Sequence, residues 1–421
     1  MIRRAFSTGG RYLTDPVVDM EDEVSKCINC GFCESVCPTL PSAGFVASHG
    51  ARGRVDLGLS LVNEIRTGKR SLRVSDPFYS CLDCFACLQV CPAGVNAGKV
   101  SHLAREIIAE TDLVLPQEKD LAAMIVSVTM EKMNPLGLRR ECARWSSGLS
   151  FSKNSTTLLY TGNMYQLMPY SFALGRAGKI LGEEAFVSVS RFIRKHPDIA
   201  GITAFMKNAP MEKNVNLYLR SIYTLLRKAG ISFQYLGEEE PYPGTFIYDL
   251  GYINEFSIYA ERVTDIFRRR NVTEIITIDP HTYDLLKNQY PRYVKGFDFD
   301  VRYYAEYLQN LEFRKTGERV TFHEPCHFVL RDVKDFDLKR MIGNVSKMEL
   351  PERSGKRVMC CGGPAELLFP DISKNVSDER FRQLKATGTE SIITACPVCF
   401  SNLKKDDSVE DVSSFLLRHL M

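Results

Sequence analysis

Two stretches decide the fold of this chain: Cys27-Ile28-Asn29-Cys30-Gly31-Phe32-Cys33-Glu34-Ser35-Val36-Cys37-Pro38 and Cys81-Leu82-Asp83-Cys84-Phe85-Ala86-Cys87-Leu88-Gln89-Val90-Cys91-Pro92. Both follow the spacing C-x2-C-x2-C-x3-C-P, in which three close thiolates hold one [4Fe–4S] cluster and the fourth reaches a second cluster. Zinc is the competing interpretation, but zinc sites usually use two C-x2-C pairs rather than two quartets. The spacing therefore predicts a two-cluster ferredoxin module.

In this arrangement the last cysteine of each run ligates the cluster of the other run, which we call crossed pairing. The eight thiolates then form two sets. The first cluster is expected on Cys27, Cys30, Cys33 and Cys91. The second cluster is expected on Cys81, Cys84, Cys87 and Cys37. Arg52 and Arg54 follow the first run, and near anionic clusters they would raise the reduction potentials. The alternative is that both arginines are solvated at an exposed helix start.

The rest of the composition is that of an ordinary globular protein. The chain has 421 residues, of which 44% are hydrophobic and 25% charged, and its formal net charge is +3. This length predicts two or three domains, and the small charge gives no reason to expect a nucleic-acid partner. Of the 14 cysteines only Cys142 lies outside a compact motif, and it is expected to be a small buried hydrophobe. Because metal-type cysteines need a reducing compartment, a cytoplasmic location is expected, either free or peripheral on the inner face of the membrane.

Changes in pattern divide the chain into four segments. Residues 1–115 are expected to form the ferredoxin domain, and 116–152 a helical connector. The apolar helical pattern within that connector suits either a helix packed between domains or one that lies on a membrane surface or a membrane subunit. Residues 153–300 and 301–421 are expected to form two α/β halves.

An internal duplication relates those halves. Residues 274–283 align with 391–400, and Asn271 then stands opposite Gly388 at a left-handed helix cap. A strand is also expected over 231–236. The predicted fold class is α+β and multi-domain, with a mostly helical two-cluster ferredoxin domain followed by a duplicated α/β cysteine-rich domain with pseudo-twofold halves.

The second half carries its own cysteine constellation. It consists of Cys326, Cys360, Cys361, Cys396 and Cys399. The alternation of strands and helices places these cysteines in loops after strands, where sites collect in parallel sheets. Five thiolates exceed the four that one cubane or one zinc ion needs, which leaves open a cubane, a non-cubane cluster or zinc.

Histidines surround this constellation in the sequence. His323 and His327 bracket Cys326, and hydrogen bonding to the site or proton transfer is favoured over direct ligation because the thiolates already fill the coordination sphere. His327 is taken with the five cysteines as a catalytic candidate. His281 and the remaining histidines are interpreted as structural or surface residues.

Taken together, these motifs give the chain a family resemblance. It resembles the iron–sulfur oxidoreductases that join a twin-cluster ferredoxin module to cysteine-rich CCG domains, which include the catalytic subunits of heterodisulfide reductase, the iron–sulfur subunit of glycolate oxidase, the C subunit of anaerobic glycerol-3-phosphate dehydrogenase and lactate-utilisation proteins. Arg52-Gly53-Arg54 and Cys91-Pro92-Ala93-Gly94-Val95 are most similar to the glycolate oxidase and glycerol-3-phosphate branch. His323-Glu324-Pro325-Cys326-His327 is similar to the motif of the second CCG domain.

The chain departs from this family in its first half, where the cysteines of a CCG domain are missing. The residues at their positions are Asn163, Tyr242-Pro243-Gly244, Asp279 and Thr282. The first half is therefore expected to be structural. The departure also weakens a direct transfer of function from heterodisulfide reductase, whose active site uses two complete motifs.

The resemblance implies an electron-transfer subunit. A flavin-containing dehydrogenase for a 2-hydroxy acid or glycerol 3-phosphate would pass electrons through two [4Fe–4S] clusters to the CCG cluster, and on to a quinone, a membrane-associated subunit or another acceptor. No Gly-rich dinucleotide fingerprint follows a strand, so neither flavin nor nicotinamide is expected in this chain. The alternative is a catalytic subunit that reduces a disulfide at the five-cysteine site. A redox or metal sensor is a third hypothesis, which no DNA-binding patch supports.

Overall fold

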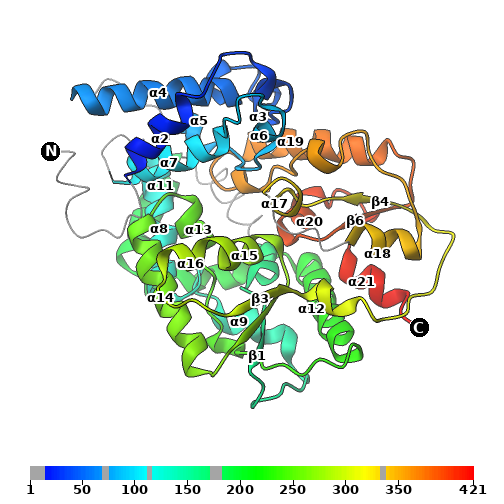
Figure 1. Cartoon of the computed structure of the whole chain (residues 1–421). Coiled ribbons are helices and arrows are strands. Elements are labelled where there is room, and N and C mark those ends of the chain that lie inside the picture. Colours follow the sequence, from blue (N-terminus) through cyan, green and yellow to red (C-terminus); the bar gives the residue numbers. More distant parts are fainter. Residues whose placement is uncertain (1–14, 69–74, 111–115, 171–182, 332–337) are drawn as a thin grey trace.

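A computed structural model describes residues 15–68, 75–110, 116–170, 183–331 and 338–421. The parts of the predicted ferredoxin domain at 1–14, 69–74 and 111–115 lie outside the described residues. Figure 1 shows the ferredoxin unit at the top, the cysteine-rich half at the right in orange and red, and the first half below in green. The chain is mostly helical with two small parallel sheets, as the sequence predicts at this coarse level.

Three helices form the frame of the ferredoxin unit: α2 (Pro16–Val24), α4 (Ala51–Thr67) and α7 (Ala97–Ala109), which contact one another. Helix α4 ends at Gly68, which has φ of 71° in the left-handed region that glycine adopts freely. The shorter helices are η1 (Phe32–Ser35), α3 (Thr39–Ser42), η2 (Ala47–His49), α5 (Asp76–Tyr79) and α6 (Ala86–Val90).

The start of α7 is fixed against the second cysteine run. The Asn96 side chain accepts hydrogen bonds from the Gly98 and Lys99 backbone N–H groups, and the buried Glu23 carboxylate accepts one from the Asn96 N–H at 2.8 Å. A Cβ on Gly98 would lie 2.6 Å from the Phe85 ring, so only glycine lets the helix approach the cysteine loop this closely.

The connector forms helix α8 (Pro116–Lys132) and the short helix α9 (Arg139–Ala143). Leu121, Met124, Ile125 and Val128 of α8 are buried, and the helix contacts α11 (Glu183–Lys195), η4 (Pro197–Met206) and α13 (Thr245–Asp249). Its apolar residues therefore pack inside the protein, as the interdomain interpretation predicts. Within the described part of the chain, no helix is both long and apolar enough to cross a lipid bilayer.

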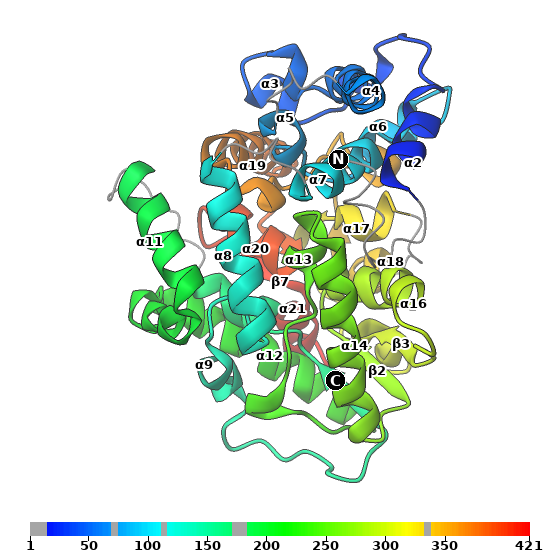
Figure 2. The same ribbon diagram turned by 90° about the vertical axis from the view of Figure 1, so that its left-hand side faces the viewer.

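Two parallel sheets form the cores of the two halves. The first has the order β1-β2-β3, with β1 (Thr157–Tyr160), β2 (Glu274–Thr277) and β3 (Asp300–Tyr303). The second has the order β5-β4-β6-β7, with β4 (Arg319–His323), β5 (Lys347–Met348), β6 (Ser391–Thr394) and β7 (Val409–Asp411). Helices α12 (Ala209–Lys228), α14 (Ile253–Arg269), α19 (Pro370–Lys385) and α21 (Val412–Arg418) cover them. Figure 2 shows α12 beside α21, and these two helices contact each other across the halves.

The strand predicted over 231–236 is wrong. Of this segment only Gln234 pairs with the sheet, as an isolated parallel bridge to Leu158. The side chains on either side of it, Phe233 and Tyr235, instead join an aromatic cluster with Phe151, and this packing replaces a regular ladder.

Several backbone features recur at the positions that the predicted duplication pairs. Asn271 and Gly388 are both left-handed, with φ of 52° and 66°, and Gly244 and Gly362 have φ of 90° and 89°. Asp279 caps α15 (Pro280–Asp284) where Cys396 caps α20 (Pro397–Leu403). These matches favour the duplication, which stays a prediction.

In the first half, a self-contained polar network fills the place of the missing cysteines. The buried Glu240 carboxylate accepts hydrogen bonds from the backbone N–H of Thr161, at 2.6 Å, and from its hydroxyl. The Asn163 amide donates to the Glu240 carbonyl at 3.2 Å. Burial raises the pKa of Glu240 to about 8. The network satisfies these groups within the protein, so this half is built as a scaffold.

The raised pKa predicts a pH-dependent stability. Between pH 4.5 and about 8 the unfolded chain releases the Glu240 proton while the folded chain keeps it, so stability falls as the pH rises. Glu240→Gln mimics the protonated form and is expected to flatten this decline in thermal unfolding temperature. Glu238→Gln, at an exposed neighbour, is the control and should follow the wild type. Equal slopes in wild type and Glu240→Gln would contradict the prediction.

Candidate iron–sulfur sites

The four cysteines predicted for the first cluster line one cavity. Cys27, Cys30, Cys33 and Cys91 surround it together with Arg52 and Val55. Cys30 is exposed, and the other three thiols are half-buried. The crossed pairing expected from the spacing is thus the one that the fold brings together, and all four thiols are free to ligate metal.

The four cysteines predicted for the second cluster line a neighbouring cavity. Cys81, Cys84, Cys87 and Cys37 surround it, with Arg54 and Gly98 among the other lining residues. Ala97 lines both cavities, so the two sites are adjacent. Cys37, Cys84 and Cys87 are buried, which makes this site the more enclosed one.

Both cysteine runs bend in the same way. Asn29 and Asp83, two residues after the first cysteine of each run, are left-handed, and so are Gly31 and Phe85 two residues further on. Asparagine and aspartate tolerate this conformation, whereas Phe85 costs about 1–3 kcal/mol there and is held by its surroundings. Arg331 lies over the Phe85 ring, 4.3 Å from its centroid. The repeated turn wraps the backbone around each cavity.

The two arginines of the first domain have different environments. Arg54 is buried, and its guanidinium donates to Cys37 Sγ at 3.7 Å, to the Ser80 hydroxyl at 3.2 Å and to the Pro77 carbonyl. The Arg52 side chain is 41% exposed and lies 3.8 Å from Asp56. Arg54 is therefore the cation that acts on a cluster sulfur, and Arg52 is largely solvated.

The five late cysteines converge in a second buried centre. Cys326 begins α17 (Cys326–Val329) after β4, Cys396 and Cys399 lie at the start of α20 after β6, and Cys360 and Cys361 precede η9 (Gly363–Ala365). All five are buried. Cys360 contacts Cys326 and Cys361, and Cys361 and Cys396 each contact Cys399.

The electrostatics of this centre favour one thiolate, at Cys361, while the pKa values of Cys360, Cys396 and Cys399 are raised. Contacts with the Cys360 and Cys399 thiols and with His323 hold the pKa of Cys361 well below its usual range, despite burial. Contacts with the Cys326, Cys361 and Cys84 sulfurs, together with burial, raise the pKa of Cys360. Sulfurs that share protons in this way suit soft metal binding, since the thiolate is the ligand form.

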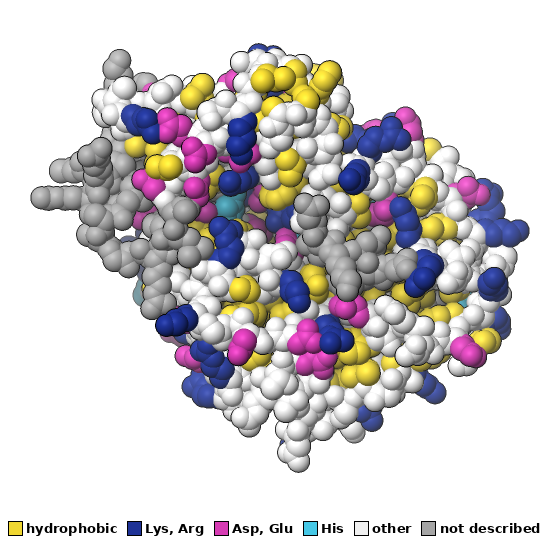
Figure 3. Space-filling view, in the orientation of Figure 1, with side chains coloured by type: hydrophobic (Ala, Val, Ile, Leu, Met, Phe, Trp, Pro, Cys, Tyr) yellow, Lys and Arg dark blue, Asp and Glu magenta, His cyan; other side chains and the backbone are white. Residues whose placement is uncertain are grey.

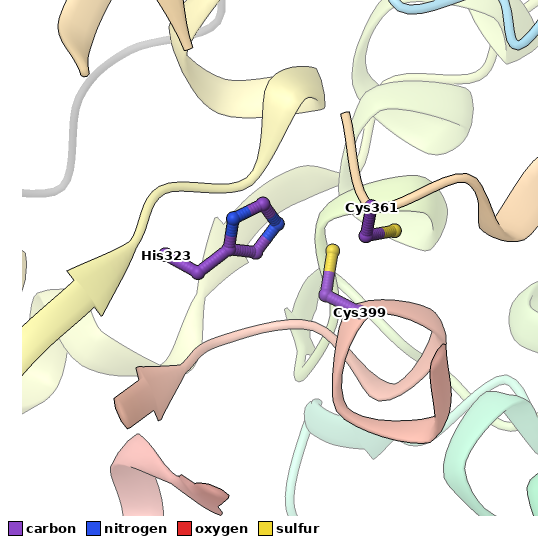
Figure 4. A group of neighbouring side chains, drawn as sticks. All are labelled: His323, Cys361 and Cys399. Atoms are coloured by element: carbon purple, nitrogen blue, oxygen red, sulfur yellow. The ribbon is translucent and has the colours of Figure 1, made fainter. Parts of the chain in front are cut away.

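His323 is the histidine that joins these sulfurs. A ring nitrogen of His323 and the sulfurs of Cys361 and Cys399 lie within 4.8 Å of one another, as Figure 4 shows. The buried Arg380 donates its Nε–H to His323 Nδ1 at 3.1 Å, so Nδ1 accepts and Nε2 carries the proton. His323 Nε2 is buried beside the sulfurs and has no hydrogen-bond partner among the described residues, so the role of His323 as a hydrogen-bond donor to this centre stays a prediction.

The other two histidines lie side by side. His327 Nδ1 donates to Asp284 Oδ2 at 3.0 Å, and its role as a catalytic candidate stays a prediction. His281 is buried rather than at the surface: its ring is tilted by 48° against that of His327, with 3.9 Å between the ring centroids, and its Nδ1 lies 3.8 Å from Cys396 Sγ. The duplication held a signal for it, because His281 stands opposite Val398, between the two paired cysteines.

The two cysteine centres touch. Cys84 of the second ferredoxin run contacts Cys360 of the late constellation, and the hydrogen bond from Cys360 lowers the pKa of Cys84. Arg331 reinforces this junction, because its guanidinium lies 3.3 Å from Asp83 and 3.0 Å from Asp284. One buried cation thus ties the ferredoxin unit to both α/β halves.

Comparison with known proteins follows this division. Residues 23–95 match the family described as "4Fe-4S dicluster domain", and residues 320–404 match the family described as "Cysteine-rich domain", CCG. The chain joins a 4Fe-4S dicluster domain to a cysteine-rich CCG domain. Neither match extends into residues 153–300, where the cysteines are missing.

Three relatives illustrate the similarity. The probable iron-sulfur-binding oxidoreductase FadF of Bacillus subtilis is 27% identical over 85% of this chain and 46% of its own length. The probable glycolate oxidase iron-sulfur subunit of the same organism is 24% identical over 91% of this chain and 89% of its own. A component of the dihydromethanophenazine:CoB–CoM heterodisulfide reductase from Methanosarcina mazei is 21% identical over 93% and 92%.

These relatives confirm the predicted resemblance to iron–sulfur oxidoreductases. The chain nevertheless spans less than half the length of several curated relatives, from 28% to 46%. The assignment of individual cysteines to clusters stays a prediction.

Removing one predicted ligand tests that assignment. Cys37→Ala is expected to remove the second cluster and to lower the iron content by about four atoms per chain, because the other three thiolates cannot complete the site. Cys142→Ala is the matched control, since Cys142 is equally buried but lies outside both cavities. Iron and acid-labile sulfide are measured in the wild type and in both variants. Equal iron content in Cys37→Ala and Cys142→Ala would refute the assignment of Cys37 to the second cluster.

Arg54 provides a test of the second site's electrostatics. Arg54→Gln removes a buried cation beside Cys37 and is expected to make the potential of that cluster more negative by tens of millivolts. Arg52→Gln should shift the potential of the first cluster less, because water screens the half-exposed Arg52. Redox titration followed by electron paramagnetic resonance measures both shifts, and a larger effect of Arg52→Gln would contradict this account.

Proposed function

We propose that this chain is the iron–sulfur electron-transfer subunit of an oxidoreductase complex. The contiguity of its three cysteine-lined sites carries this proposal. The first cavity opens at Cys30, shares Ala97 with the second, and the second meets the late constellation where Cys84 contacts Cys360. Clusters bound there would supply one-electron carriers. The chain's own part is to space the ligands, exclude water from the inner sites and place Arg54 and His323 against sulfur.

A flavin-containing dehydrogenase is the proposed electron donor, and it docks at the exposed end of this series. Two residues either side of the exposed Cys30 in the chain, the apolar side chains of Ile28 and Phe32 are 65% and 60% exposed. Figure 3 shows hydrophobic side chains on the outer surface of the ferredoxin unit at the top of the molecule. Exposed apolar groups beside a redox centre fit a partner that binds there to exchange electrons.

The proposed substrate and acceptor are those that the family resemblance implies. A 2-hydroxy acid or glycerol 3-phosphate would be oxidised by the partner, in line with the name of the glycolate oxidase relative. A third iron–sulfur cluster, cubane or non-cubane, would sit on the five late cysteines, with zinc as the alternative. From there electrons would pass to a quinone or to a membrane-associated subunit.

A second candidate function is reduction of a disulfide at the late constellation. The fifth thiolate favours it, because four sulfurs saturate a cubane and one remains for substrate chemistry. The relative that is named as part of a heterodisulfide reductase supports it as well. The first half lacks the corresponding cysteines, which argues against two such centres in this chain.

Metal analysis with spectroscopy separates the two functions. The electron-transfer function, called the relay below, predicts three clusters and about twelve iron atoms per chain. It also predicts that the flavoprotein reduces all three clusters and that they are reoxidised without added thiol. A paramagnetic species that forms only on thiol addition would instead establish disulfide chemistry. About eight irons with zinc at the late site would rule out both a third iron–sulfur cluster and disulfide reduction there.

A further inference from the structure

A cavity lies where the ferredoxin unit, the connector and both α/β halves meet, and we name it the junction cavity. Its volume is about 150 Å³. Figures 1 and 2 show α8 and α13 beside each other at this junction, and the two helices are in contact. Its apolar walls include Leu121, Met124, Ile125, Met168, Phe246 and Leu368.

One end of the junction cavity is polar. Arg105, Asp249, His281, His327 and Arg331 line it. These groups are held in place: Arg105 donates to the Asp249 carbonyl at 2.9 Å, and His327 Nδ1 donates to Asp284. Nδ1 of His281 faces Cys396, and Nδ1 of His327 faces Asp284. Nε2 is therefore the second polar atom of each ring. The cavity thus joins an apolar body to a fixed set of hydrogen-bonding groups.

The junction cavity also lies between two redox sites. Cys81 and Leu82 line both this cavity and the second cluster cavity. On the other side, His281 reaches Cys396, and Val398 is the neighbour of Cys399. A molecule in the cavity would contact the surroundings of both predicted electron carriers.

The chemistry of the walls selects the occupant. A hydroxy acid or a phosphate ester would bury its charge against aliphatic side chains, which is costly without a free cation. Arg331 already pairs with Asp83 and Asp284, and Arg105 donates to three backbone carbonyls. An uncharged flat ring that turns one carbonyl acceptor toward the polar end and lays its apolar edge against the aliphatic walls fits the cavity.

We propose that the junction cavity binds the head group of a quinone, which accepts the electrons of this subunit. The proposal rests on the electron-relay function above and deepens it. A cavity of about 150 Å³ takes up a single benzene ring in other proteins, so one quinone ring matches the volume. The quinone gains two electrons, supplied one at a time from the partner's reduced flavin, and two protons from water. The flavin is oxidised and hydroquinone leaves.

Binding is the direct test. A benzoquinone with a decyl tail is titrated into the anaerobic holoprotein by calorimetry, and an azido derivative of it is photocrosslinked and mapped by mass spectrometry. Saturable binding and labels on the segments that contain Leu121–Leu136, Phe246 or Leu367 are expected. The absence of saturable binding, or labels confined to other segments, overturns the proposal.

Two variants sharpen the test. Leu367→Trp and Leu136→Trp each fill the cavity from a half-buried position and are expected to weaken binding about tenfold or more. Leu311→Trp is the matched control, a half-buried leucine outside the cavity lining, and should bind as the wild type does. Equal affinity in all four proteins would place the quinone elsewhere and refute the site, and the labelling result stands even if a variant fails to fold.

The relay is measured separately, so the two proposals can fail independently. Cluster reduction by the flavoprotein and reoxidation by ferricyanide report the relay without using the junction cavity. Intact relay with no quinone binding refutes the cavity proposal alone. Quinone binding at the mapped segments without cluster reduction by any flavoprotein supports the site and refutes the donor.

Discussion

The buried ion pairs of Arg331 hold the functional parts of this protein in register. A single guanidinium from the cysteine-rich half reaches Asp83 in the second ferredoxin run and Asp284 in the first half, and all three side chains are at least nine-tenths buried. Removal of one partner from such a group leaves an uncompensated charge, at a cost of about 3–5 kcal/mol. The close approach of Cys84 to Cys360 depends on this junction, since Asp83 is the chain neighbour of Cys84.

The same charge balance explains why many cysteines can share one interior. Thiolates and their clusters are anionic, and burial without compensation would force them to take up protons. The fold places Arg54 against Cys37, and Arg380 behind His323, which in turn faces Cys361. Arg54 thus contacts a sulfur directly, whereas Arg380 acts on the sulfurs through His323. At the first site water reaches the exposed Cys30 and can stabilise its charge.

The first α/β half carries buried hydrogen bonds at the positions that the predicted duplication pairs with the late cysteines. Glu240, Thr161 and Asn163 satisfy one another where the other half carries sulfur, and Asp279 caps a helix where Cys396 stands. This half nevertheless contributes to the cysteine centre, because His281 and Asp284 extend from it toward Cys396 and His327. The first half thus supplies part of the surroundings of the late cysteines.

The sequence by itself determined the two cysteine runs and the strands that precede the late cysteines, and it predicted the crossed pairing of the two runs. These features depend on spacing and backbone preference within a few residues, which sequence periodicity reports directly. It could not show that His323 rather than His327 faces the sulfurs, because Pro325 between them removes a regular periodicity. The strand expected at 231–236 was lost to aromatic packing with residues far away in the chain. Only the tertiary structure decided that Cys84 meets Cys360, that His281 joins the late centre and that an apolar cavity lies between the redox sites, because these depend on how separate segments pack together.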